Sequence, residues 1–355
     1  MPNFSGFSDI LKQHLPRHKA RTGCPANIII AIFVRQTVNP AGLKGLFSSK
    51  AKPESPYRRM QRFFSGNFIG KTDIARFIFA LFGWQGVRPT LDRTTWEYGK
   101  SCINIPVPAV VRRGVAIPIL WKTADKKGNS NTGERTALPD LFRGTFPDLH
   151  IETLYADREF IGNEWPAYLR QAGISCCIRC KENAQIAGKN GARQALKKHF
   201  WELKTGEGKT PGPVMLYGQQ HYLEATRLPD GQLPVVCSDK EGKGIREYGG
   251  RRQIESLFGC LKSKGFNPED THMTAPEKMD RLMTILATGF VPACRAGEAE
   301  DKRRRIRVKK HGRKARSLFR AGPDRLVAVL FGGIGPVDLL GGNVLDLLAV
   351  REKTG

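Results

Sequence analysis

Apolar and polar positions divide the chain into a helical beginning and a middle section of short strands. Residues 1–85 carry apolar side chains at mixed spacing, as in 28–34 and 64–82, with basic residues scattered between them, so we expect helices there. Strand-like segments follow at 87–93, 103–111, 115–123, 150–156 and 174–179. Helices are predicted at 134–146 and 165–172. The resulting element order is β-β-β-α-β-α-β.

A second group of strand signals lies between the fifth strand and the next helix. Segments 213–217, 221–228 and 233–238 alternate between apolar and polar residues, and Pro229-Asp-Gly231 has the composition of a hairpin turn. These signals predict a β-rich insertion rather than a plain surface excursion. The predicted divisions are 1–85, helical and basic; 86–180, the first part of a core; 181–245, the insertion; 246–295, the end of the core; and 296–355, a basic region with an apolar tail.

Several prolines conflict with this pattern. Pro106 and Pro108 fall in the second strand, which should be internal to the sheet, where proline removes a ladder donor. Pro292 and Pro323 should interrupt helices. These residues suggest a chain whose fold or activity is impaired. The tail over 327–350 is apolar and rich in glycine, consistent with a docking helix pair or with sequence free of functional constraint.

The segment 248–262 has the most informative polar pattern. It places Tyr248, Arg251, Glu255 and Lys262 at the spacing Y-x2-R-x3-E-x6-K. On a helix that turns about 100° per residue, the last three lie within roughly 40° of one another, with Tyr248 within about 60°. One carboxylate, two cations and a phenol on one face suit a metal-bound, negatively charged substrate such as a DNA backbone. The alternative is a solvated helix face with an Arg–Glu pair four residues apart.

This spacing resembles the YREK signature of transposases of the insertion-sequence-four family. Two further segments are similar to family blocks around catalytic aspartates: 91–96, which contains Asp92, and 154–162, which contains Asp157. The three blocks occur in the family's order, and the similarity extends from about Arg58 to Arg320.

The resemblance implies an α/β fold: an RNase H-like mixed sheet, a β-rich insertion before the Glu-bearing helix and a helical N-terminal region that binds DNA ends. It implies a cut-and-paste DNA transposase with Asp92, Asp157 and Glu255 as catalytic residues and ligands of two Mg²⁺ ions, for which Mn²⁺ can substitute. One ion would activate the attacking water or 3′-hydroxyl, and the other would stabilise the leaving oxygen. The implied partners are double-stranded DNA, at the transposon ends and the target, and a second copy of the chain in the DNA complex.

Other residues are expected to contact DNA. Arg251 and Lys262 would bind backbone phosphates, and Tyr248 would donate its hydroxyl to one. Arg93 and Arg158, each next to a catalytic aspartate, are further candidates, although such arginines often pair with local carboxylates. The family resemblance also makes Trp201 a candidate for stacking on a flipped base, the alternative being a small-core residue.

The charge of the chain agrees with a polyanionic partner. Its 58 Lys and Arg against 33 Asp and Glu give a net charge of +25. The excess is concentrated at two places: residues 1–80 hold 13 basic and 3 acidic residues, and residues 301–320 hold 11 and 1. The second region could be a disordered arm, but Leu318 and Phe319 indicate that part of it packs.

The eight cysteines are interpreted as reduced thiols. Cys177 and Cys180 have CxxC spacing but no second pair at a structural-zinc spacing, and they lie in a buried strand signal. The chain starts without a secretory pattern and has no apolar run long enough to cross a bilayer, so we expect a cytoplasmic protein with no membrane partner. The family resemblance implies a bacterial, nucleoid-associated protein.

Two other functions fit part of the pattern. A transposase-derived, non-catalytic DNA-binding protein would keep the basic regions but not need the carboxylates. An RNase H-like nuclease without strand transfer would need the carboxylates but not the tyrosine and lysine of the signature.

Overall fold

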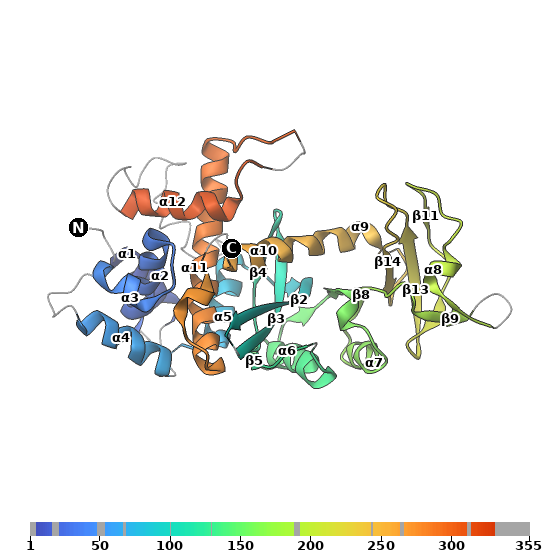
Figure 1. Ribbon diagram of the computed structural model, residues 1–355, viewed down its shortest axis with the longest axis horizontal. Helices are drawn as coiled ribbons and strands as arrows, with labels where there is room; N and C mark the ends of the chain where they lie inside the picture. The colour runs from blue at the N-terminus through green and yellow to red at the C-terminus, as the bar shows by residue number, and fades with distance from the viewer. Residues whose placement is uncertain are drawn as a thin grey trace.

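The computed structural model describes residues 5–15, 21–47, 54–66, 69–99, 101–128, 130–187, 192–242, 244–262, 266–310 and 314–330. N-terminal helices gather at one end of an elongated molecule, a sheet lies in the middle, and the strands of the predicted insertion form the other end (Figure 1). The N-terminal elements are α1 (Ser5–His14), α2 (Gly23–Arg35), α3 (Pro40–Leu43), the 3₁₀ turn η2 (Lys44–Leu46), α4 (Glu54–Ser65) and α5 (Lys71–Phe82).

The N-terminal helices pack around a long C-terminal helix. Helix α11 (Pro276–Arg303) contacts α2, α4 and α5, and its middle residues are buried together with Ile28, Ile29 and Ile30 of α2. Helix α2 is apolar on nearly every face, which is the pattern of a helix enclosed on all sides. This helical end therefore shares one core with the C-terminal part of the chain.

The central sheet has the strand order and directions of an RNase H-like fold. Its strands are β2 (Pro89–Tyr98), β3 (Ser101–Arg112), β4 (Val115–Pro118), β5 (Ala124–Asp125), β7 (Thr153–Ala156) and β8 (Ser175–Arg179). Strands β2, β3 and β4 form an antiparallel meander, and β7 and then β8 add in parallel on the other side of β2. The short strands β1 (Gly86–Val87) and β6 (His150–Ile151) pair separately in parallel.

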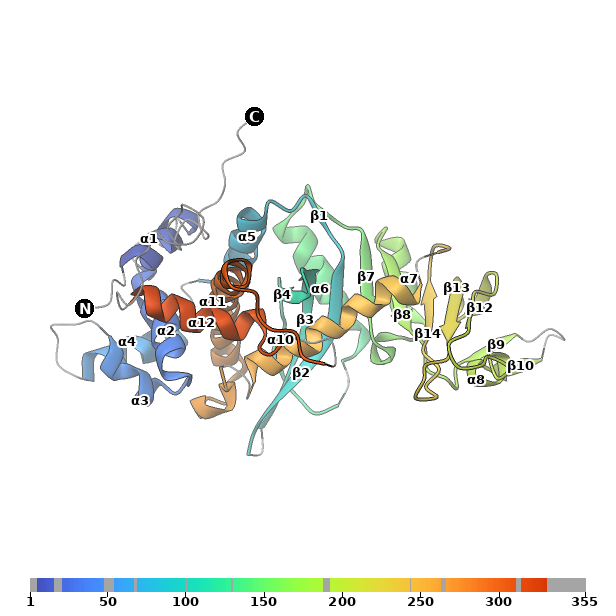
Figure 2. The same ribbon diagram turned by 90° about the horizontal axis from the view of Figure 1, so that it is seen from above.

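Helices cover both faces of this sheet. Helices α6 (Thr132–Thr145) and α7 (Glu164–Gln171) share a core with Leu91, Leu154 and Cys176. Helix α10 (Gln253–Leu261) packs on β2, β3 and β4, and it shares a core with Ile105 and Val107 (Figure 2). The observed elements match the predicted order, and the fold class is confirmed.

The insertion continues the central sheet. Its elements are β9 (Gln185–Ala187), β10 (Arg193–Ala195), α8 (Leu196–His199), β11 (Gly208–Lys209), β12 (Val214–Leu216), β13 (Gln219–Thr226) and β14 (Val235–Ser238). Strand β14 pairs antiparallel with β8 of the core, and β13 pairs with β14. One hydrogen-bonded sheet thus runs from β4 through the core to β11.

The prolines of β3 do not break this sheet. Pro106 and Pro108 keep their register with Arg93 and Leu91 of β2. Their carbonyls accept from Lys122 and Ile119, so the backbone groups of both prolines point away from β2, toward the segment that follows β4. In an antiparallel strand, the N–H and C=O of one residue point to the same side. The N–H groups that the two prolines lack would therefore point toward the segment after β4, where the regular pairing of β3 with β4 has already ended.

The expectation that Pro292 and Pro323 interrupt helices is wrong. Pro292 lies inside α11, and Pro323 lies inside α12 (Leu318–Leu330). The two helices cross at glycines: a Cβ on Gly297 would lie 1.8 Å from the Leu318 carbonyl oxygen, and one on Gly322 would lie 1.7 Å from that of Ala293. Tertiary packing at this crossing overrides the local preference of proline.

Leu318 and Phe319 are buried, as predicted, and Phe319 stacks on Phe290 with ring centroids 4.9 Å apart. By contrast, residues 302–305 are exposed. Of the apolar tail over 327–350, residues 327–330 end α12, and the rest lies outside the described residues, so the expectation for the tail is not tested. All eight cysteines are free and buried, as expected for reduced core thiols. No described helix combines the length and apolarity needed to cross a bilayer.

Candidate active site

Two carboxylates lie side by side at the centre of the sheet. Leu91 of β2 is in register with Ala156 of β7, and the next residues along these parallel strands are Asp92 and Asp157. Each carboxylate accepts a 2.8 Å hydrogen bond from the backbone N–H of the residue that follows it. Asp157 is also the N-cap of a 3₁₀ turn, η3 (Arg158–Phe160). The same carboxylate thus caps this turn and lies next to Asp92.

The third carboxylate comes from a helical run that crosses the sheet. The run consists of α9 (Ile245–Tyr248), a 3₁₀ turn η4 (Gly249–Arg252) and α10, and it appears as one nearly continuous rod (Figures 1 and 2). Arg251 lies in the 3₁₀ turn and Glu255 in the first turn of α10. The tighter turn therefore changes the angular positions that a uniform α-helix would give.

Arg251 links all three carboxylates. One of its terminal nitrogens, Nη1, lies 2.7 Å from Asp92 Oδ2; the other, Nη2, lies 3.3 Å from Glu255 Oε1 and 3.6 Å from Asp157 Oδ2. The Arg251 side chain is only 7% exposed, against 18% for Asp92, 28% for Asp157 and 61% for Glu255. The predicted carboxylates are thus brought together, around a buried guanidinium.

The electrostatics of the site follow from this arrangement. Burial raises the pKa of the Asp92 carboxyl, while the Arg251 guanidinium and the Arg93 backbone N–H offset part of the rise. Burial also raises the pKa of Tyr248, so its phenol remains protonated. Its hydroxyl donates to Asp157 Oδ1 at 3.4 Å, and its ring lies under Arg251, 5.8 Å from the guanidinium carbon.

Lys262 is separated from the other residues of the signature. It is the C-cap of α10, with φ −91° and ψ −140°, and it is half-buried. Because its backbone has left the helix, its side-chain direction does not follow from the phase of Arg251 and Glu255. The structure brings together Tyr248, Arg251 and Glu255 with the two aspartates, but does not place Lys262 among them.

The two arginines next to the aspartates differ. Arg93 binds Glu159 through two hydrogen bonds of 2.9 and 3.2 Å, and it also donates to Asn104. Arg158 is exposed and lines a cleft beside Asp157. Arg93 is therefore engaged within the protein, whereas Arg158 faces solvent.

Trp201 is 69% exposed, just after the buried Phe200 at the end of α8. The small-core alternative is therefore wrong for Trp201; Phe200 fills that role. A large indole on the surface of the insertion is accessible to a ligand.

Sequence reasoning missed the residues that support the site. Asn104 is buried in β3 and donates to the Gly128 carbonyl at 2.6 Å. Tyr155 donates to Glu247 at 2.6 Å, which attaches β7 to the start of the helical run. A lone asparagine within an apolar strand was the available signal for the first, but nothing in the sequence indicates the second.

Comparison with known proteins gives one family match. Residues 123–289 match the family model described as the transposase DDE domain. The search of curated proteins found no match. Among solved structures, the chain is similar to piggyBac transposase in a cryo-EM synaptic complex with hairpin DNA, with 10% identity, a TM-score of 0.46, and coverage of 92% of this chain and 77% of that one. The matched range contains Asp157 and Glu255 but begins after Asp92, and it supports DNA transposition as the function of this chain.

Proposed function

We propose that this protein is a DNA transposase that cuts phosphodiester bonds at the ends of an insertion sequence and joins the freed ends to a target. The observation that carries the proposal is that Asp92, Asp157 and Glu255, from two parallel strands and a crossing helix, surround one guanidinium, that of Arg251. The finer assignment, to the insertion-sequence-four family, rests on the spacing of Tyr248, Arg251, Glu255 and Lys262.

The donor set suits a divalent metal, but its present arrangement does not hold one. Carboxylate oxygens are the ligands that Mg²⁺ prefers. Within the described ranges, however, no group of acidic, cysteine or histidine side chains is arranged around a common metal position. The Arg251 guanidinium lies where the three carboxylates meet, so loading with Mg²⁺ or Mn²⁺ requires this side chain to move away. When bound, the metal would polarise the phosphate and promote ionisation of the attacking hydroxyl.

The protein's own residues have separate tasks in this proposal. Asp92 and Asp157 are held by backbone N–H groups and fix the position of the reaction. Arg251, once released from its carboxylate partners, would bind a substrate phosphate, because its planar fork suits two phosphate oxygens. Tyr248 donates a hydrogen bond that orients Asp157. Trp201 offers an exposed ring for stacking on a base.

The test uses a donor plasmid that carries inverted repeats from the DNA flanking the gene. Wild-type protein with Mg²⁺ should release the segment between the repeats and insert it into a second plasmid, and Asp157→Ala should do neither. Cleavage without joining would indicate a nuclease. Folded protein that binds DNA without cutting it would indicate the non-catalytic alternative.

A further inference from the structure

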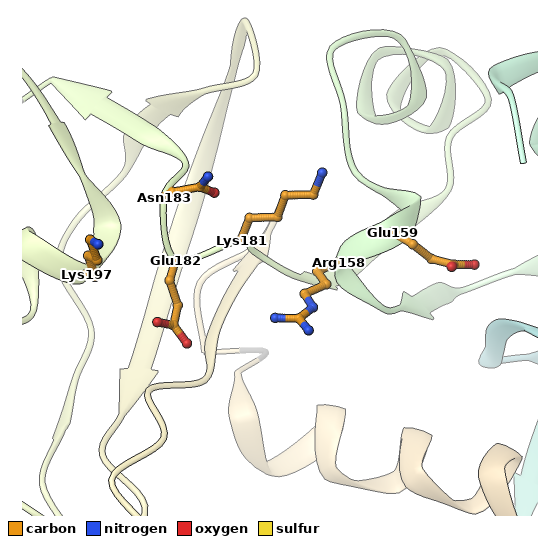
Figure 3. A pocket seen from close by; sticks show the side chains of 6 residues that line it. All are labelled: Arg158, Glu159, Lys181, Glu182, Asn183 and Lys197. Carbon is orange, nitrogen blue, oxygen red and sulfur yellow. The ribbon is translucent and has the colours of Figure 1, made fainter. Parts of the chain in front are cut away.

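A polar cleft opens directly beside Asp157. It lies between the turn η3, which follows β7, and the segment that connects β8 to the insertion, with α8 as its far border (Figure 3). The cavity measures about 490 Å³, and it is lined by Arg158, Glu159, Lys181, Glu182, Asn183 and Lys197. The cleft lies close to the active site in the chain, because its lining residue Arg158 immediately follows Asp157.

Some charged side chains of the cleft form ion pairs within the protein and others do not. The side chains of Arg158, Lys181 and Lys197 are exposed, and in the described part of the chain no carboxylate forms an ion pair with them. Glu159 is held by Arg93 and points away from the other lining residues (Figure 3). Glu182 is therefore the carboxylate that opposes the cations, and the cleft has an excess of positive charge available to a ligand.

We propose that this cleft binds the sugar–phosphate backbone of the cleaved DNA strand next to the phosphate held at Asp157. The inference rests on the proposed function and adds a binding subsite to it. A cleft of exposed cations, one of which directly follows Asp157, suits the regular negative charge of a strand. The Asn183 amide can donate to a phosphate oxygen without adding charge. Arg158 lies in η3, Lys181 follows β8 and Lys197 lies in α8, so the cations come from both the core and the insertion.

Removing the charge of Glu182 should change DNA affinity in the opposite direction from removing the charge of a lining cation. Its carboxylate repels a phosphate in the cleft, so Glu182→Gln should bind DNA more tightly than wild type, while Lys181→Met should bind it less tightly. If the cleft does not bind DNA, the two substitutions should not change DNA affinity in opposite directions. Both side chains are exposed, so neither substitution removes core packing.

The first experiment places a thiol in the cleft. Since all eight native cysteines are buried, Asn183→Cys would present a single exposed thiol, and Met215→Cys presents a matched one on β12, outside the cleft, at a residue that is 59% exposed. The probe is a short forked DNA, duplex at one end and single-stranded at the other. With free DNA at about ten times its Kd, alkylation of Asn183→Cys should slow roughly tenfold, because only unbound protein reacts. Met215→Cys should be unaffected.

Equal protection at both positions, or none at Asn183→Cys while DNA is bound, would overturn the proposal. Protection by inorganic phosphate at the same concentration would also overturn it, because the ligand would then be a free anion rather than a strand.

The second experiment measures binding of the same DNA against salt concentration. Lys181→Met should lower the slope of log affinity against log salt by about one, as expected when one phosphate contact is lost. Unchanged slopes for Lys181→Met and unchanged affinity for Glu182→Gln would reject the cleft while leaving transposition by the wild-type protein intact. Failure of the wild type to cut donor plasmid, with protection of Asn183→Cys preserved, would reject the catalytic proposal and keep the DNA subsite.

Discussion

Replacement of Arg251 by glutamine should have opposite effects on folding and on metal binding. The wild-type guanidinium lies 2.7 Å from Asp92, 3.3 Å from Glu255 and 3.6 Å from Asp157, and it is nearly inaccessible to solvent. In the metal-free protein it is the cation that compensates these carboxylates. In the metal-bound protein the same position must be vacated.

The cost to folding comes chiefly from Asp92. Breaking a buried ion pair by removing one partner typically costs about 3–5 kcal/mol. Glu255 is largely exposed and contributes little, and Asp92 keeps its bond to the Arg93 N–H, so the lower end applies. We expect Arg251→Gln to reduce the free energy of unfolding by about 3 kcal/mol in the presence of a chelator. Urea unfolding followed by circular dichroism measures this quantity.

Metal affinity should change in the other direction. The ion no longer has to displace a guanidinium, so Mn²⁺ should bind at least about tenfold more tightly, which corresponds to roughly 1.4 kcal/mol. Isothermal titration with Mn²⁺ measures the affinity without reference to activity. Arg252→Gln is the matched control, since Arg252 lies in the same turn, is exposed and loses the same charge. If Arg251→Gln binds Mn²⁺ no more tightly than Arg252→Gln, Arg251 does not compete with the metal for the carboxylates, and the proposed release step is refuted.

Three further predictions address other parts of the molecule. Asp157→Ala should lose DNA cleavage while retaining DNA binding in a mobility-shift assay, and near wild-type cleavage would remove it from the catalytic set. Replacing the exposed Arg304 and Arg305 with glutamine should lower the salt slope of DNA binding by up to about two; an identical slope would mean that this segment does not touch DNA. Gly322→Ala should reduce the free energy of unfolding by about 1–3 kcal/mol, because its Cβ would meet backbone of α11. Gly45→Ala, which has open space around the new atom, is the control, and equal unfolding curves for the two variants would contradict the close helix crossing.

Local patterns predicted the elements of this fold but not the contacts between side chains. The order of strands and helices follows from hydrophobic periodicity, and the predicted strand over 150–156 correctly places Asp157 just after a strand end. Asp92 does not lie near a strand end, because β2 continues to Tyr98, well beyond the predicted strand over 87–93. The pairing of Arg251 with Asp92 joins residues far apart in sequence and depends on a 3₁₀ turn that the helical pattern does not reveal. The prediction that Pro292 and Pro323 interrupt helices failed for a similar reason, because tertiary packing stabilises the helices that contain them. The continuity of the insertion with the core through β8 and β14 has no local signal either.

That continuity determines how the far end of the molecule can move. An insertion joined by flexible linkers would move as a separate body, and the distance from its cations to the active site would vary. Here β14 hydrogen-bonds to β8, and β8 to β7, the strand that presents Asp157. Rotation of the insertion would have to twist or break these hydrogen-bonded pairs of strands. The pairing therefore fixes the position of the insertion relative to the active site. For the proposed function, the position of DNA bound at this end would depend on the stiffness of the sheet. Substitutions that weaken the pairing of β8 with β14 should therefore make the position of the cleaved phosphate more variable before they unfold the protein.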